Sequence, residues 1–382
     1  MTVQDAVART TGTPGEQGGR PWLMLATLLL GQLMGVLDVL IVNVAMPEIG
    51  TDLHASGATL QLVVGGYTVA YAMLLVTGAR LGDLFGRRRM YLLGVVLFTL
   101  TSLVCGFAPN SAVLVIFRFL QGAGAAVMVP QIMSVIQMRF TGAARAKALS
   151  AYGAVLSTGA VLGLIVGGVL VNADLFGATW RPVFLVNVPV GVLLTVLVPK
   201  LVPADEPRGT RRLDFAGLGI ASSAVCLVVL PLVLGHELGW PAWSFACIGL
   251  GLVLAGVFVA VERRIAAAGG DPLLDLKVLK TPGIMAGIGT LATTQIAYGG
   301  FLFIFTLHLE AGLGDGALQA GLTYVPMSAT FGLLGFYWRK LPAGLQHLRG
   351  PLGAGLAVLG YLGIAAAMHG GGQDSALMWA SL

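Results

Sequence analysis

Two ionisable side chains stand inside long apolar stretches of this sequence. Asp38 occurs in LMGVLDVLIVNVAMPEI, and Arg118 occurs in VIFRFLQGAGAAVMVP. Apolar surroundings favour the protonated form of a carboxyl group, so such an acid can bind and release a proton as its access to water changes. A nearby guanidinium keeps its charge and favours the ionised acid. An acid and an arginine on facing helices could therefore couple proton binding to helix movement. The alternative is a structural ion pair, or an aspartate bonded to backbone.

A second charged group occurs between two apolar stretches, in the segment GARLGDLFGRRRM from Gly78 to Met90. We interpret the segment as a loop that holds two helices in a switchable relation, with its acid near a helix terminus or an arginine across the first half of the chain. In the alternative, its arginines only fix topology and contact anionic headgroups. The segment combines one acid, a glycine bend and a basic cluster: Asp83, Gly86, Arg87, Arg88 and Arg89.

The composition indicates a membrane around these groups. Apolar residues make up 57% of the 382-residue chain, charged residues make up 10%, and the mean hydropathy is +0.88. A soluble fold of this length could not cover so many apolar side chains. The formal net charge of +5 follows the connections between apolar stretches, so we predict no nucleic-acid partner.

Stretches of about 20 apolar residues, long enough to cross a bilayer as a helix, recur along the chain. Since only a helix satisfies its own backbone in lipid, the predicted fold class is an all-α integral membrane protein. We predict a partial twelfth span at SALMWASL after eleven complete ones: residues 22–46, 59–80, 90–108, 111–137, 148–172, 183–202, 215–235, 242–262, 283–307, 318–338 and 351–369.

The basic residues predict the orientation of these spans. Lysines and arginines gather on alternate connections, which predicts a cytoplasmic N-terminus. We predict that the protein is a multi-pass protein of the inner (cytoplasmic) membrane. Residues 1–20 are polar and rich in glycine and threonine, so we predict a disordered cytoplasmic segment and no signal peptide.

Enzymatic chemistry has little support in the sequence. Cys105, Cys226 and Cys247 all fall within predicted spans, which suggests neither a disulfide framework nor a metal site. We find no nucleotide-binding glycine loop between a strand and a helix, and no nucleophile with a plausible base. The prediction is therefore a protein that is not an enzyme and holds no cofactor.

Several motifs together resemble the major facilitator superfamily, in particular its fourteen-span drug:proton antiporter family. The segment from Ala79 to Arg88 matches the signature G-x-L-x-D-x-x-G-R-R, except that Ala79 replaces a glycine and Leu84 replaces a common basic residue. WRPVFLVNVPVG resembles the family's entry to span six, RLDFAGLG the start of its central pair, and QAGLTYVPMS a later span start. The first-span and fourth-span signatures match at Asp38, Asn43, Ala45 and Pro47, and at Arg118, Gln121, Gly122, Gly124 and Ala125.

The fifth span departs from the antiporter signature G-x-x-x-G-P-x-x-G-G. The chain reads GAVLGLIVGG, in which Leu164 stands at the proline position. Glycines at this spacing share one helix face and allow close helix approach, and we favour a role at the interface between domains over plain packing. The missing proline keeps a facilitator or importer without proton antiport as an alternative. The glycines are Gly159, Gly163, Gly167 and Gly168.

The resemblance implies two six-helix halves with a substrate site between them. The expected domains are residues 1–20, a first bundle at 21–205, a central two-helix insertion at 206–270 and an incomplete second bundle at 271–382. The implied function is proton-coupled efflux of drugs or amphipathic metabolites, with Asp38 and Arg118 in proton coupling; the partners are that substrate, protons and the lipid bilayer. The other alternative is a truncated membrane remnant without transport; on that interpretation the 382-residue chain alone should not confer drug resistance, whereas a version extended by about three spans should.

Overall fold

The computed structural model is built from helices. It describes residues 21–173, 177–204, 214–270, 272–273, 276–314 and 349–369, together with 319, 322–324, 326, 327 and 330. No strand occurs in this part of the chain. The all-helical fold confirms the predicted fold class.

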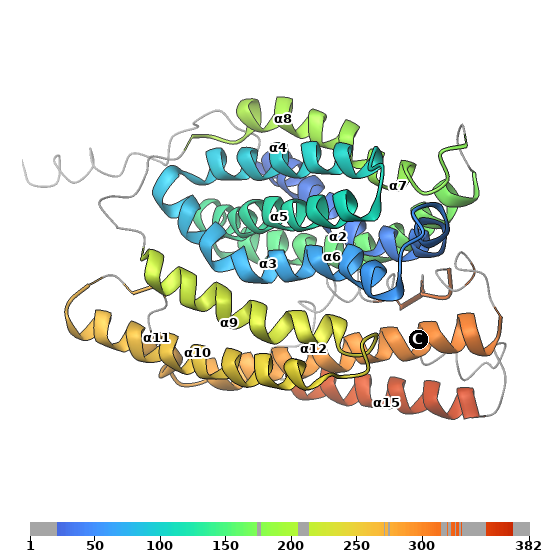
Figure 1. Cartoon of the computed structure of the whole chain (residues 1–382). Coiled ribbons are helices and arrows are strands. Elements are labelled where there is room, and N and C mark those ends of the chain that lie inside the picture. The colour runs from blue at the N-terminus through green and yellow to red at the C-terminus, as the bar shows by residue number, and fades with distance from the viewer. Residues whose placement is uncertain are drawn as a thin grey trace, which may run out of the picture.

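The first group of helices forms a bundle, in blue to green in Figure 1. Within it α3 and α4 both pack along α5, α2 packs along α6, and α8 contacts α4 and α2. The buried charges lie inside this bundle, Asp38 near the middle of α2 and Arg118 in the first third of α5. Its members are α2 (Pro21–Asp52), α3 (Gly57–Phe85), α4 (Arg87–Gly106), α5 (Ser111–Arg139), α6 (Gly142–Asn172), α7 (Pro182–Leu185) and α8 (Asn187–Leu201).

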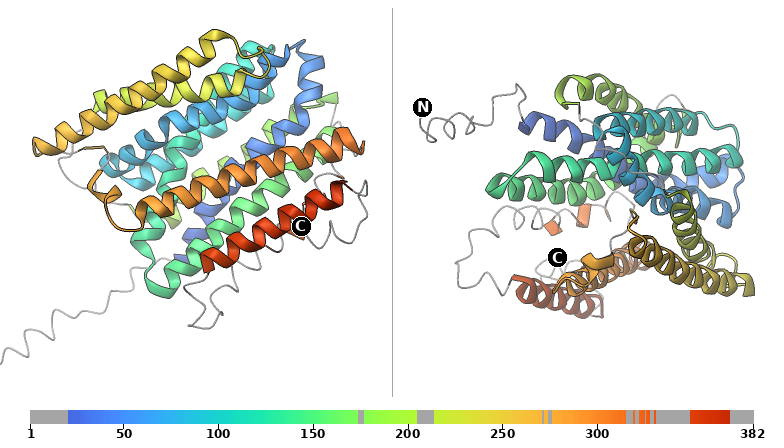
Figure 2. Two further views of the ribbon diagram at one scale, coloured as in Figure 1. Left: turned by 90° about the horizontal axis from the view of Figure 1, so that it is seen from below. Right: turned by 90° about the vertical axis from the view of Figure 1, so that its left-hand side faces the viewer.

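The second group lies against one side of the first, in yellow to red in Figures 1 and 2. In it α9 packs on α10 and also on α3. The end of α12 meets α6 through an apolar cluster that includes Val161, Phe305 and Leu309. Its members are α9 (Phe215–Leu234), α10 (Ala242–Ala267), α11 (Leu276–Leu279), α12 (Ile284–Leu307), the π-helical turn η2 (His308–Gly312) and α15 (Arg349–His369).

The predicted spans agree closely with these helices. Nine helices in the described part of the chain are long and apolar enough to cross a membrane, and α12 coincides with the span predicted at 283–307. The span predicted at 318–338, the partial twelfth and the segment 1–20 lie wholly or mostly outside the described residues.

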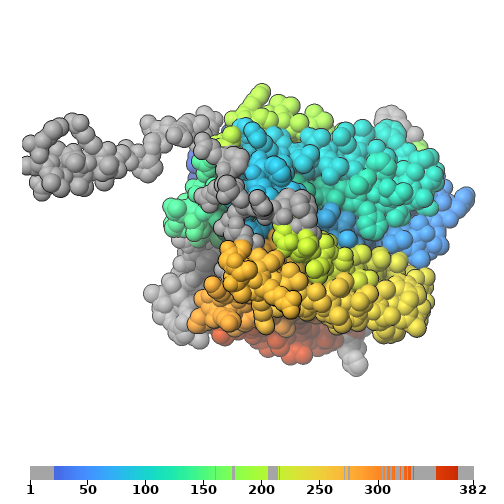
Figure 3. Space-filling model, turned by 60° about the vertical axis from the view of Figure 1, so that its left-hand side comes forward, coloured from blue at the N-terminus to red at the C-terminus, as the bar shows by residue number. Residues whose placement is uncertain are grey.

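The outer surface of the helices suits lipid. Leu250, Leu252 and Val253 of α10 and Leu356 and Leu359 of α15 are all more than half exposed. Figure 3 shows α10, in yellow and orange, along the outer face of the second group. Exposed apolar side chains on this scale fit hydrocarbon rather than water.

The structure corrects the prediction of a loop from Gly78 to Met90. Helix α3 continues to Phe85 and α4 begins at Arg87, so only Gly86 separates them. Gly86 has φ 92°, a conformation that glycine adopts without the steric cost that other residues meet. The sequence signature therefore marks a one-residue corner between two helices, not an extended loop.

Polar residues define where several helices begin. Ser56, Asn110 and Asp214 each precede a helix, and their side-chain oxygens accept a hydrogen bond from a backbone N–H in its first turn. These caps satisfy donors that the helix itself leaves unpaired. The caps fix the starting points of α3, α5 and α9.

Candidate functional site

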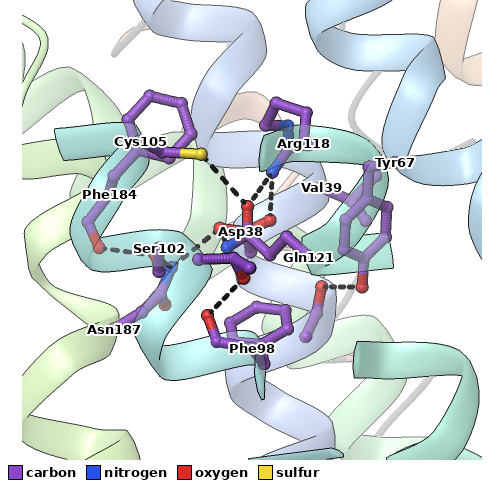
Figure 4. Close-up of polar contacts among 12 residues, drawn as sticks. Asp38, Val39, Tyr67, Phe98, Ser102, Cys105, Arg118, Gln121, Phe184 and Asn187 are labelled. Carbon is purple, nitrogen blue, oxygen red and sulfur yellow. Dashed lines mark hydrogen bonds and ion pairs between the residues drawn. The ribbon is translucent and has the colours of Figure 1, made fainter. Parts of the chain in front are cut away.

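Asp38 lies at the centre of a buried polar network. Its side chain is 0% exposed, on α2. One carboxylate oxygen, Oδ2, accepts from Nη1 of Arg118 at 2.5 Å. The other, Oδ1, accepts from Nε2 of Gln121 at 2.8 Å and from Nδ2 of Asn187 at 2.7 Å. Figure 4 shows these three side chains converging on the carboxylate from α5 and α8.

Arg118 is held from several sides. Its Nε donates to the backbone oxygen of Val63 on α3 at 2.8 Å, and its Nη1 also donates to Gln121 Oε1 at 2.9 Å. The guanidinium carbon lies 4.9 Å from the ring centre of Tyr67 and 5.7 Å from that of Phe184. Its Nη2 has no hydrogen-bond partner among the residues that the structure describes. Buried aromatic faces stabilise such a cation.

Asn187 connects the carboxylate to a further layer. Its Nδ2 also lies 3.1 Å from Oγ of Ser102 on α4, and that hydroxyl donates to the backbone oxygen of Phe184 at 2.9 Å. Asn187 is part of the WRPVFLVNVPVG motif, but the sequence alone indicated no site role for Asn187, Ser102 or Tyr67. A polar side chain inside an apolar helix was the available signal for Asn187.

The network has a clear chemical consequence. Three donors surround one carboxylate, and their charge-assisted hydrogen bonds offset the cost of burying it. Protonation would remove that charge and leave the buried Arg118 without its counter-ion. Because the donors come from α5 and α8 while the acid is on α2, a change in protonation alters how three helices are held together.

The second acid–arginine pair lies at the α3–α4 corner. Asp83 Oδ1 accepts from Nη2 of Arg87 at 2.6 Å, with side-chain exposures of 37% and 9%. Asp83 thus lies in the last turn of α3 and pairs with the first residue of α4 rather than with an arginine from elsewhere in the bundle. Arg88 donates to the backbone oxygen of Val202, just after α8, at 3.3 Å, where the helix C-terminus favours a cation.

The remaining first-span and fourth-span residues have structural positions. Asn43 donates to the Val39 oxygen in its own helix at 3.3 Å, and Pro47 is exposed, so neither contacts the Asp38 network. A Cβ at Gly122 would lie 2.3 Å from the backbone oxygen of Tyr67, and one at Gly124 would lie 2.9 Å from the backbone nitrogen of Phe98. These glycines let α5 approach α3 and α4 closely.

The fifth-span glycines face α2 of their own bundle. A Cβ at Gly163 would lie 3.0 Å from the oxygen of Leu37, and Gly159 and Gly167 also meet α2 side chains. Gly168 is buried in the same turn. These contacts show packing of α6 on α2 within one bundle, and they do not support the role at the interface between domains that we favoured for the glycines. It is Leu164 that packs with the apolar cluster shared by α6 and α12.

A cavity of about 670 Å³ opens among α3, α5 and α6. We call it the α3–α5–α6 cavity. Its lining combines apolar side chains with two phenols, a hydroxyl, an amide and the charged side chains of Arg80 and Asp83. The lining residues are Tyr71, Leu75, Val76, Ala79, Arg80, Asp83, Val129, Pro130, Met133, Ser134, Gln137, Tyr152 and Leu273. Arg80 donates to the backbone oxygens of Pro272 and Leu273 beside it.

The described residues contain no cluster of histidine, cysteine, aspartate and glutamate that could hold a metal ion. Cys105, Cys226 and Cys247 are free.

Curated relatives include exporters and resistance proteins. The chain is 38% identical over 353 residues to the probable actinorhodin transporter of Streptomyces coelicolor, covering 91% of this chain and 61% of that protein. It is 35% identical to the cephamycin export protein CmcT of Amycolatopsis lactamdurans, covering 85% and 67%. It is 34% identical to the multidrug resistance protein Stp of Mycobacterium tuberculosis, covering 94% and 66%. The chain thus spans about 61% of the length of the first of these relatives.

Solved structures share the fold. The proton:xylose symporter XylE, bound to 6-bromo-6-deoxy-D-glucose, matches with a TM-score of 0.62 at 15% identity, over 94% of this chain and 77% of that one. The family model described as Major Facilitator Superfamily matches residues 28–382. The prediction that this multi-pass membrane protein is not an enzyme is confirmed by the family and the fold. The chain belongs to the major facilitator superfamily.

Proposed function

We propose that this chain acts in proton-coupled export of amphipathic small molecules across the cytoplasmic membrane. The observation that carries the proposal is the fully buried Asp38, which receives hydrogen bonds from Arg118, Gln121 and Asn187. Burying a carboxylate costs free energy unless a counter-ion and hydrogen bonds compensate the charge. An ionisable group inside a membrane-spanning helix therefore usually has a function. Here the compensation comes from other helices, which makes it adjustable.

Proton binding at Asp38 supplies the coupling step. When the carboxylate is neutralised, the hydrogen bonds from Arg118, Gln121 and Asn187 lose their charge assistance. The relation of α2 to α5 and α8 then favours a second arrangement, and the two arrangements differ in the side of the membrane from which the carboxyl group is reached. A proton entering from outside and leaving inside could drive the substrate in the opposite direction.

The substrate class follows from the relatives and the cavity together. Relatives are named for actinorhodin transport, cephamycin export and multidrug resistance. The α3–α5–α6 cavity combines apolar lining residues with the polar groups of Tyr71, Ser134, Gln137 and Tyr152. Such a lining suits an amphipathic drug or metabolite.

The remaining assignments complete this proposal. The N-terminus lies in the cytoplasm, residues 21–205 form the first bundle and 206–270 the central insertion before a second bundle from 271 onward. The pair of Asp83 and Arg87 then lies at the cytoplasmic end of α3 and acts with Gly86 and Arg88 as a conformational switch. The salt bridge between Asp83 and Arg87 and the hydrogen bond from Arg88 to the Val202 oxygen support a latch between α3, α4 and the end of α8.

Efflux in cells tests the function directly. A bacterial strain without its own exporters, expressing the chain, is loaded with a fluorescent amphipathic dye, and dye loss is followed before and after a protonophore is added. We expect efflux that the protonophore stops. Efflux that persists without a proton gradient would favour the facilitator alternative. Correctly inserted protein with no efflux would favour the alternative of a membrane protein without transport.

A further inference from the structure

We propose that the ring of Tyr67 is the barrier between Asp38 and water in the α3–α5–α6 cavity, so that its displacement opens the proton path on that side. The inference rests on the proposed proton role of Asp38. It names a residue that neither the signature motifs nor the relatives assign.

A row of α3 positions four residues apart leads from the cavity to the buried site. Each step advances about 6 Å along the helix and turns about 40° around it, so neighbouring members of the row lie next to each other. Asp83, Ala79, Leu75 and Tyr71 follow this spacing, and all four line the cavity. The next position in the row is Tyr67, which does not line the cavity. One step further is Val63, whose backbone oxygen accepts from Arg118.

The contacts of Tyr67 place it between the two environments. Its ring is parallel to that of Tyr71, with centroids 6.3 Å apart and an interplanar angle of 4°. The Arg118 guanidinium carbon lies 4.9 Å from the same ring, and Arg118 holds Asp38 at 2.5 Å. Tyr67 is 4% exposed, whereas Tyr71 is partly exposed at the cavity wall. Tyr67 therefore lies between Tyr71 at the cavity wall and the cation of the ion pair.

Charged and polar groups lie on both sides of Tyr67. The cavity side carries Asp83, Arg80 and the phenol of Tyr152. The buried side carries Asp38 and Arg118, whose Nη2 has no partner among the described residues. Water that passed Tyr67 could bond to that nitrogen and reach the carboxylate. A ring at this position excludes water and contacts the cation with its face.

The hydroxyl of Tyr67 ties the barrier to the helix that carries the acid. It donates to the backbone oxygen of Gly35 on α2 at 3.4 Å, three residues before Asp38. Movement of α2 on proton binding would therefore displace the attachment point of the ring. This geometry gives the barrier a direct mechanical link to the state of Asp38.

Chemical labelling of Asp38 tests the barrier in the full chain. Purified protein in lipid nanodiscs is treated with a water-soluble carbodiimide and an amine in mildly acidic buffer, and adducts at Asp38 are measured by mass spectrometry. We expect Asp38 to be protected in the wild type and in Tyr67→Phe, which retains the ring. Tyr67→Leu should lose the protection and gain an adduct at Asp38. Tyr67→Met is the second variant if the leucine protein does not fold.

The matched control is Tyr91→Leu, since Tyr91 is equally buried, donates to the Leu28 oxygen at 3.1 Å and lies outside the cavity lining. Labelling of Tyr91→Leu as fast as Tyr67→Leu would indicate general loosening and overturn the proposal. Continued protection in folded Tyr67→Leu or Tyr67→Met, or free labelling of the wild type, would also overturn it. The assay reads water access and not transport, so missing dye efflux would contradict the proposed function alone.

Discussion

Two of the acid–arginine pairs in the described residues have almost the same length and very different surroundings. Arg118 and Asp38 meet at 2.5 Å with both side chains fully buried, whereas Arg87 and Asp83 meet at 2.6 Å with the acid 37% exposed. Distance alone would rate the pairs as equal. Burial decides what each can do, because an exposed pair exchanges with water and salt whereas a buried charge that loses its partner is stranded.

The partners of the two pairs differ in the same sense. Asp38 is bonded from two other helices, α5 and α8, through side chains far apart in sequence. Asp83 is bonded by a residue four positions along the chain, across a one-residue corner. The buried pair is therefore suited to sensing helix arrangement and the corner pair to holding two adjacent helix ends.

The largest effect is expected from removing the buried cation. Arg118→Met strands the Asp38 charge, which should cost about 3 to 5 kcal/mol of folding stability and abolish transport. Thermal unfolding of the purified protein in detergent measures the first and dye efflux the second. Adding Asp38→Asn to Arg118→Met should recover most of the stability and none of the transport. If the double variant were no more stable than the single one, the stranded-charge account would be wrong.

A smaller effect is expected from Asn187, which donates to Asp38 and contacts Ser102. Asn187→Leu removes one of the hydrogen bonds that hold α8 to the Asp38 carboxylate, so gradient-driven efflux should fall, though by less than in Arg118→Met. The control is Asn43→Leu, because Asn43 donates only within its own helix. Unchanged efflux in Asn187→Leu would separate Asn187 from the coupling site.

The smallest stability effect is expected at the α3–α4 corner, where Asp83 is partly exposed and Arg87 is buried. Asp83→Asn should change stability by about 0 to 1 kcal/mol. Both Asp83→Asn and Arg87→Ala should slow efflux with insertion and orientation intact. Arg89→Ala is the matched control, since Arg89 is exposed on the same turn. Accessibility labelling reports the orientation. An inverted orientation in the single variants would support the view that these arginines only set topology.

The helices could be predicted from sequence because their cause is local. Runs of apolar residues of membrane-spanning length placed α2 to α10, α12 and α15 within a few residues of their observed positions, apart from the ends that extend beyond the hydrocarbon. The corner at Gly86 was predicted too long, because the charged residues around it read as a loop while in the structure they continue both helices. Polarity marks the membrane boundary and does not mark the helix end.

The site could be predicted only in part. Asp38 and Arg118 were found because an ionisable group inside an apolar stretch is conspicuous. Asn187 and Tyr67 were not assigned, because their importance comes from contacts with residues distant in sequence. The spacing of the fifth-span glycines predicts one helix face but not the partner of that face, which proved to be α2. Packing partners are set by the whole bundle and not by a local pattern.

The central claim is that Asp38 carries the coupled proton, and the most direct measurement is dye efflux driven by an imposed pH gradient in membrane vesicles containing Asp38→Asn. The amide keeps the size of the side chain but cannot bind and release the proton. The account predicts loss of gradient-driven efflux in this variant, with normal efflux in Glu48→Gln, which changes an exposed acid on the same helix. Undiminished gradient-driven efflux by the Asp38→Asn protein would contradict the account.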